Sequence, residues 1–216
     1  MRILPALRLA ALAVCFLFAG IAGAAAHPHV WVTAKSELLY SPDGRLKAIR
    51  HAWTFDDMFS AFAIQGIDKD KDGKLSREAL APLAKENVES LKEFAYFTVS
   101  KRGDKAIEFE DPVDYWLEAD DKGILTLHFT LPIKGAGPKG GVALDVYDPT
   151  YFVSFSLAEE KPVSLVGAPA GCAIETKGPP DDSAAQGNPS EQFFAQLNAG
   201  SSYGEMFANH IVVRCP

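Results

Sequence analysis

The chain of 216 residues contains 21 lysines and arginines against 28 aspartates and glutamates, which gives a formal net charge of −7. This acidic balance argues against nucleic acid and against an anionic membrane surface as partners. A hydrophobic content of 48% and an aromatic content of 11% supply enough apolar side chains for a folded core, which excludes a disordered chain.

The beginning of the chain has the three parts of a secretory signal peptide. Arg2 and Arg8 form the charged part, residues 9–21 are an apolar run, and three small alanines end at Ala26. We therefore predict cleavage after Ala26, a periplasmic location, and a mature chain of residues 27–216. No later stretch has the length of apolar sequence that a membrane span requires, so we expect no span in the mature chain.

The mature chain begins with a strand pattern and then changes to a helical one. Apolar and polar residues alternate over residues 27–40, and after a turn the stretch 46–55 predicts the returning strand of a hairpin. Apolar residues recur at helical spacing over residues 57–67 and again over 80–94. The acidic loop of residues 68–78 lies between these two predicted helices.

The remainder returns to strand patterns interrupted by turns rich in glycine, proline and aspartate. The predicted strands cover residues 97–101, 107–109, 115–118, 124–131, 142–147 and 151–157. Residues 176–189 lack periodicity and predict an irregular loop, which is followed by short helices at 191–197 and 203–208 and a final strand at 211–214.

These patterns predict an α+β fold with one domain over residues 27–216. The domain is β-rich, built as an antiparallel sheet or a sandwich, and carries an EF-hand-like helix–loop–helix inserted at about residues 57–94.

The acidic loop matches the first nine positions of an EF-hand calcium loop, with carboxylates at positions one, three and five and glycine at six. Position twelve departs from the motif, because Ala79 replaces the bidentate glutamate and Glu78 stands one place early. The sequence leaves open a weakened calcium site or a solvated acidic turn that keeps the shape without an ion. The predicted calcium ligands are Asp68, Asp70, Asp72, the carbonyl of Lys74, and Glu78.

The mature chain keeps two cysteines, Cys172 and Cys215, after Cys15 leaves with the signal peptide. An oxidising compartment favours a disulfide between them, which would close a loop of about forty residues and contribute about 3–4 kcal/mol. The alternative is a thiolate site, but neither cysteine lies in a CxxC motif or near a histidine.

The strongest chemical signal is the pair His27 and His29 at the predicted mature terminus. Strand side chains alternate, so both imidazoles should point to the same side, beside the free amine of His27. Pro28 has no amide proton, which excludes the square-planar copper and nickel motif that uses deprotonated amides. Amine and imidazole donors suit zinc, copper, nickel or cobalt. The alternative is an exposed, frayed terminus.

Further ligands for such an ion would come from elsewhere in the fold. The candidates are His51, Asp56, Asp57, His128, Asp148 and His210. From these we select His51, Asp57 and Asp148. Each has a structural alternative: His51 as a core histidine, Asp57 together with Asp56 as the cap of the next helix, and Asp148 in a turn. No nucleophile or nucleotide-binding motif occurs, so we do not expect an enzyme.

Five segments together resemble one bacterial family. They are the acidic loop with its following helix, HPHVWVTA at 27–34, WTFDDMFSAF at 53–62, VYDPTYFVSF at 146–155 and FANHIVVRC at 207–215. The family is the domain of unknown function numbered one thousand and seven, described as the periplasmic component of an uncharacterised transport system. Its members often lie beside nickel/cobalt-type metal transporters, so the resemblance implies metal handling.

Two functions of different classes follow. The first is a periplasmic accessory protein that binds a transition metal, and calcium in addition, for a membrane metal transporter. The second is a copper enzyme with an amino-terminal histidine brace, and a calcium-stabilised binding module without a transition metal is a further alternative. We favour the accessory protein, because a brace requires a distant second histidine whereas His29 is only two residues from His27.

Overall fold

The computed structural model of the chain describes residues 27–179 and 191–216. The predicted signal peptide and residues 180–189 of the predicted irregular loop lie outside the described residues.

One sheet has six strands and contains the hairpin at the start of the described residues. The strand order is β5-β6-β2-β1-β8, and β9 also pairs with β1. β1 is antiparallel to β2 but parallel to β8 and β9. The strands are β1 (Val30–Tyr40), β2 (Leu46–Phe55), β5 (Val113–Ala119), β6 (Leu125–Pro132), β8 (Val153–Leu157) and β9 (Val163–Val166).

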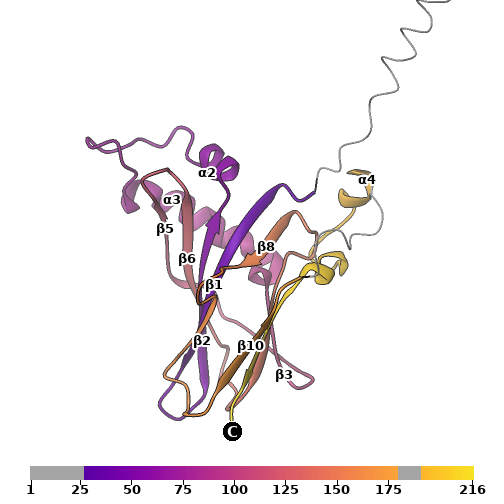
Figure 1. Cartoon of the computed structure of the whole chain (residues 1–216). Helices are drawn as coiled ribbons and strands as arrows, with labels where there is room; N and C mark the ends of the chain where they lie inside the picture. The colour runs from indigo at the N-terminus through magenta and orange to yellow at the C-terminus, as the bar shows by residue number, and fades with distance from the viewer. Residues whose placement is uncertain (1–26, 180–190) are drawn as a thin grey trace, which may run out of the picture.

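The second sheet has five strands in the order β10-β11-β7-β3-β4, and all of its pairings are antiparallel. Its strands are β3 (Thr98–Arg102), β4 (Lys105–Ile107), β7 (Val142–Val146), β10 (Ala173–Lys177) and β11 (Asn209–Arg214). The fold is therefore β-rich with two mainly antiparallel sheets, and Figure 1 shows them as two layers.

Two helices lie between β2 and β3. They are α2 (Asp57–Ala63) and α3 (Arg77–Leu91), and α3 continues into the 3₁₀ segment η1 (Lys92–Phe97). Asp56 caps α2 by accepting from the amide of Phe59, and Ser76 caps α3 by accepting from the amide of Ala79. The helices flank the acidic loop in the predicted interval, but the fold by itself does not establish an EF-hand.

The remaining helical segments follow the undescribed loop. They are α4 (Glu191–Phe194) and η3 (Tyr203–Phe207).

Alternating residues of the strands and one face of α3 form a common core. Trp53 of β2 and Phe129 of β6 are almost fully buried, in ring contact with their centroids 4.7 Å apart. Leu80, Ala84 and Val88 recur every four residues on α3, and all three join the same core cluster. This spacing explains why the segment folds as a helix against the sheet.

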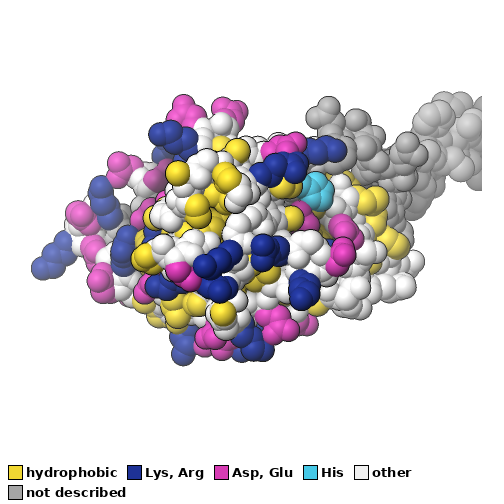
Figure 2. All heavy atoms as spheres, turned by 90° about the horizontal axis from the view of Figure 1, so that it is seen from below, with side chains coloured by type: hydrophobic (Ala, Val, Ile, Leu, Met, Phe, Trp, Pro, Cys, Tyr) yellow, Lys and Arg dark blue, Asp and Glu magenta, His cyan; other side chains and the backbone are white. Residues whose placement is uncertain are grey.

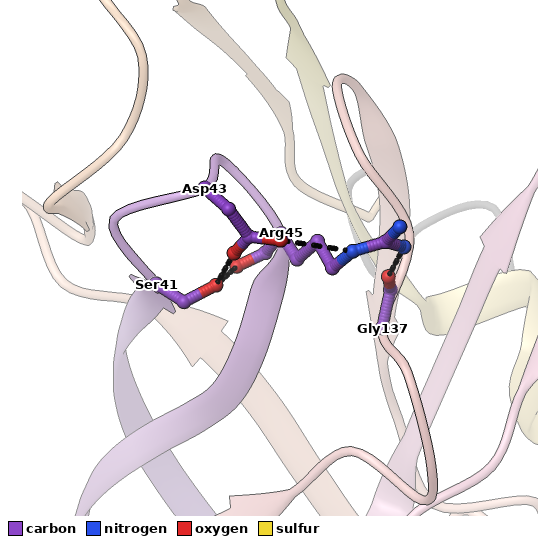
Figure 3. A network of polar contacts seen from close by, with 4 residues as sticks. All are labelled: Ser41, Asp43, Arg45 and Gly137. Atoms are coloured by element: carbon purple, nitrogen blue, oxygen red, sulfur yellow. Dashed lines mark hydrogen bonds and ion pairs between the residues drawn. The ribbon is translucent and has the colours of Figure 1, made fainter.

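A polar network fixes the turn between β1 and β2 (Figure 3). Asp43 accepts from the hydroxyl of Ser41 at 2.6 Å and from Nε of Arg45 at 3.0 Å, and Arg45 donates on to the carbonyl of Gly137 at 2.9 Å. The Ser41 hydrogen bond is the main cause that lowers the pKa of Asp43. Position 137 requires glycine, because the Cβ atom of any other residue would lie 1.8 Å from the carbonyl oxygen of Leu46.

The predicted disulfide is confirmed. Cys172, directly before β10, is bonded to Cys215, directly after β11. No helix among the described residues has the length and apolarity needed to cross a bilayer.

Candidate functional site

His27 and His29 lie side by side. The ring centroids of His27 and His29 are 4.6 Å apart, as the alternation of an extended chain predicts, although β1 itself starts only at Val30. The amide of His29 donates to the carbonyl of Phe152 at 2.9 Å, which ties this segment to the start of β8. The pair therefore has a fixed position beside the sheet.

Both histidines line a surface pocket of about 460 Å³. Its other polar residues are Asp148 and Thr150. Its apolar lining comes from three separate elements and consists of Phe94, Phe97, Phe152, Val153, Phe194, Ala195 and Leu197. We call this the histidine pocket.

Aromatic rings hold the two imidazoles. His27 stacks on Phe194 of α4 with 3.9 Å between centroids, and His29 lies 4.7 Å from Phe152. Figure 1 shows the corresponding arrangement of elements, with the start of β1 next to α4 although they are far apart in the sequence. The wall behind the histidines is thus apolar, and the polar groups of the pocket are few.

Asp148 is buried within a tightly bonded turn at the pocket. Its Oδ1 accepts from the amide and the hydroxyl of Thr150, each at 2.8 Å, and its Oδ2 accepts from the amide of Val153 at 2.9 Å. Gly204 approaches the turn so closely that a Cβ atom would lie 1.7 Å from the carbonyl oxygen of Asp148. The carboxylate therefore organises the turn that precedes β8 and brings Phe152 to the pocket.

His51 is placed in the interior and away from the histidine pocket. Its Nδ1 lies 3.0 Å from the hydroxyl of Ser36 and its Nε2 lies 3.3 Å from the hydroxyl of Thr98. Complete burial lowers the pKa of the His51 imidazole to about 3. The structure thus gives His51 the surroundings of a neutral core histidine, the alternative that the sequence left open, and does not bring it to His27 and His29.

The other candidates from the sequence also lie elsewhere. Asp57 is exposed in the first turn of α2, where its Oδ1 accepts from the amide of Met58. His128 lies 3.0 Å from a carboxylate oxygen of Glu118 and stacks on Trp116. His210 lies 2.7 Å from Asp145. Of the further ligands we selected, only Asp148 shares a pocket with His27 and His29.

The acidic loop is held by its own backbone and by one ion pair. The amide of Asp70 donates to the carbonyl of Lys74 at 2.8 Å, and the amide of Lys74 donates to Oδ1 of Asp72. The ammonium of Lys74 lies 2.7 Å from Asp121, and this contact lowers the pKa of the Asp121 carboxyl. Gly73 adopts the left-handed conformation that the motif requires of its glycine.

Within residues 27–179 and 191–216, no group of three or more histidine, cysteine, aspartate and glutamate side chains is arranged to hold a metal ion. The acidic loop and the histidine pocket both lie within these ranges. Figure 2 shows acidic and basic side chains interspersed with apolar ones over the face seen from below.

The aromatic wall of the pocket could not be predicted from the sequence. Phe94, Phe97 and Phe194 come from two segments that meet only in the folded chain. The single local signal was Phe152, a large aromatic residue next to the turn at Asp148, which remains 46% exposed.

Comparisons with known proteins agree on the relationship and supply no activity. Residues 12–215 match a family described as a protein of unknown function (DUF1007). An uncharacterised protein of Haemophilus influenzae is 26% identical over 198 residues, which cover 89% of this chain and 93% of that protein.

Proposed function

Because this chain belongs to the DUF1007 family of proteins of unknown function, we propose a function from its own residues. The chain is an exported protein that binds a transition-metal ion at its mature amino terminus and serves a membrane metal transporter. One observation carries the proposal, namely the contact of the His27 and His29 rings at 4.6 Å in an open pocket.

The donor set follows from this contact together with the proposed cleavage after Ala26. Cleavage would place an amine on His27, so that one amine and two imidazoles could supply three nitrogen donors. Nitrogen donors of this kind suit zinc, copper, nickel or cobalt. Asp148 contributes by holding the turn at the pocket wall, since its two oxygens already accept three hydrogen bonds.

The chain's own geometry favours an accessory protein over a histidine-brace enzyme. A brace needs the amine and ring of the first residue and a second histidine from a distant part of the chain. The distant histidines are His51, His128 and His210, and each is engaged with other side chains outside the histidine pocket. The pocket therefore offers an open two-histidine site in which the second histidine is only two residues from the first, without the distant histidine of a brace.

The metal site is tested by titrating zinc and copper into the mature protein and its variants by calorimetry. We expect His29→Ala to weaken binding, whereas the matched variant His210→Ala, which removes another exposed histidine, should leave it unchanged. Equal affinities for His29→Ala and the unsubstituted protein would place any metal site elsewhere.

The transporter role is tested separately in cells. Deletion of the protein should reduce the accumulation of one transition metal at limiting supply, and restoring the unsubstituted protein, but not His27→Ala/His29→Ala, should correct it. Unchanged metal content in the deletion strain would contradict the transport role. The metal-binding site is tested independently by the titration.

A further inference from the structure

A pocket of about 230 Å³ lies on the outer face of the six-stranded sheet, the face turned away from the core. Ala52 of β2 forms its floor, because Ala52 pairs with His128 of β6 on one side and with Lys35 of β1 on the other. Directly paired side chains point to the same face of a sheet. The methyl group of Ala52 therefore lies between two longer side chains, and this difference in size leaves the hollow. We call this the basic pocket.

Cationic side chains outnumber acidic ones around the basic pocket. Lys35, Arg50 and Lys161 line it together with one carboxylate, that of Glu37. Arg50 donates to Glu37 at 2.8 Å, so this carboxylate is already paired. Among the described residues, Lys35 and Lys161 are exposed and form no ion pair or side-chain hydrogen bond. The pocket is thus locally positive in a chain whose net charge is −7.

The path of the chain brings Lys161 to this place. β8 ends its pairing with β1 at Ala34, and β9 begins its pairing with β1 at Ser36. The loop between β8 and β9, which contains Lys161, therefore leaves and rejoins the sheet beside Lys35. Lys161 has a φ angle of 45°, in the left-handed region that is uncommon for a residue with a Cβ atom. One lysine from a strand and one from a loop thus border the same hollow.

His128 and Ser164 add hydrogen-bonding groups to the lining of the basic pocket. The His128 ring stacks on Trp116 with 4.5 Å between centroids, and its Nε2 lies 3.0 Å from a carboxylate oxygen of Glu118. Because that contact occupies Nε2, Nδ1 is the ring nitrogen that remains for a ligand. A fixed imidazole and a hydroxyl beside cationic side chains suit a ligand with charged oxygen acceptors.

We propose that the basic pocket binds a small oxyanion of the phosphate type that carries two negative charges. The lysine ammonium groups attract such an ion as point charges. The volume of the pocket is below the about 300–1,000 Å³ of sites for larger organic ligands, so a compact ion fits better than a nucleotide. Within the described part of the chain, the basic pocket and the histidine pocket have no lining residue in common. The proposal is therefore independent of the metal site.

The first test titrates metal-free protein with sodium phosphate by calorimetry at low ionic strength. We expect saturable binding that weakens as sodium chloride is added, because salt screens exposed charges, and weaker binding of acetate, which carries one charge. Glycerol 3-phosphate distinguishes the source, since tighter binding of this ester than of phosphate would identify an esterified phosphate as the ligand. No saturable binding of either phosphate compound, or equal affinities for phosphate and acetate, would overturn the proposal.

The second test locates the ion with two charge reversals. Lys35→Glu should weaken phosphate binding by about tenfold or more, since one hydrogen bond to a charged group contributes about that factor. Lys101→Glu is the matched control, because Lys101 is exposed on β3 of the other sheet and its substitution changes the net charge equally. Thermal melts verify that both variants fold. Equal weakening by the two substitutions would refute the location.

The third test needs no substitution in the protein that is titrated. Nuclear magnetic resonance follows the histidine ring signals during the phosphate titration, and spectra of His128→Gln and His210→Gln assign them. The His128 signals should shift saturably while those of His210 stay constant, because His210 also lies against a carboxylate but does not line the basic pocket. Unchanged His128 signals, or equal shifts of both rings, would contradict binding in this pocket.

Discussion

Asp56 connects two elements through one carboxylate. Its Oδ1 accepts from the amide of Phe59 at the start of α2, and its Oδ2 accepts from the amide of Trp31 in β1, both at 2.8 Å. The sequence already indicated the helix cap, and the structure confirms it. The bond to Trp31 depends on the pairing of β1 with β2, so no local pattern could have predicted it.

The first prediction concerns this residue. Asp56→Ala should lower the free energy of unfolding by about 1–2 kcal/mol, since a lost cap alone costs about 1 kcal/mol. Asp57→Ala is the matched control, because Asp57 is exposed and, among the described residues, accepts only from the amide of its neighbour Met58. Urea denaturation measures both variants. Equal stability of the two would show that the Asp56 contacts contribute nothing.

The second prediction concerns His51 and acid stability. Its folded pKa is about 3 and its unfolded pKa is about 6.5, so between these values the unfolded state binds the additional proton. The stability contributed by neutral His51 is therefore present above pH 6.5 and is lost as pH falls toward 3. By pH 5 the loss is about 2 kcal/mol.

The measurement is the pH dependence of urea unfolding with metal-free protein. His51→Gln should be less stable at pH 7, because two hydroxyls lose a well-placed partner, but it should lose less stability between pH 7 and pH 5. If the free energy of unfolding changed equally with pH in both proteins, His51 would not be the buried neutral group that causes the loss of stability.

At the scale of elements, strand prediction succeeded where one face of the strand is buried. The bounds of β2 agree with the sequence prediction, and β1 shows a regular alternation of buried and less buried residues. β9 and β10 were missed. β9 has only four residues, and β10 is exposed along its whole length, so neither produces an alternating hydrophobic pattern.

The candidate site also has one part that local sequence patterns predict and another part that depends on tertiary contacts. The proximity of His27 and His29 follows from local alternation and was predictable. The apolar wall was not, because η1 and α4 reach the histidines through tertiary contacts. The surroundings of His51 likewise depend on Ser36 and Thr98 of other strands, so its sequence context could not decide between core residue and ligand.

The third prediction concerns the acidic loop between α2 and α3. A weakened calcium site built from Asp68, Asp70, Asp72, Lys74 and Glu78 should bind only at millimolar calcium, because the bidentate glutamate is missing at Ala79. Ala79→Glu should strengthen binding, while Asp70→Ala should abolish it. Calorimetry that detects no heat for either the unsubstituted protein or Ala79→Glu would identify the loop as a solvated turn.

The fourth prediction concerns the disulfide, which joins the chain before β10 to the chain after β11. Cys172→Ser/Cys215→Ser should lower the free energy of unfolding by about 3–4 kcal/mol. β10 is an exposed edge strand whose only pairing in the described structure is with β11, so hydrogen exchange should increase most there. Faster hydrogen exchange in β1 and β2 than in β10 would contradict the prediction that the disulfide stabilises mainly β10.

At the scale of the whole molecule, the fold brings a beginning, a middle and an end of the chain to one place. His27 and His29 precede β1, Asp148 and Phe152 lie between β7 and β8, and Phe194 belongs to α4. Two histidines held by such distant segments of the chain can form a defined site.

The central claim is that the amine of mature His27 is a metal ligand together with the two imidazoles. The most direct measurement compares zinc and copper titrations of protein that begins at His27 with protein that carries one additional alanine before it. Loss of an outer-shell partner alone weakens metal binding about 10–100-fold, so displacing a direct donor should weaken it by at least about tenfold. Equal affinities of the two proteins would contradict the claim.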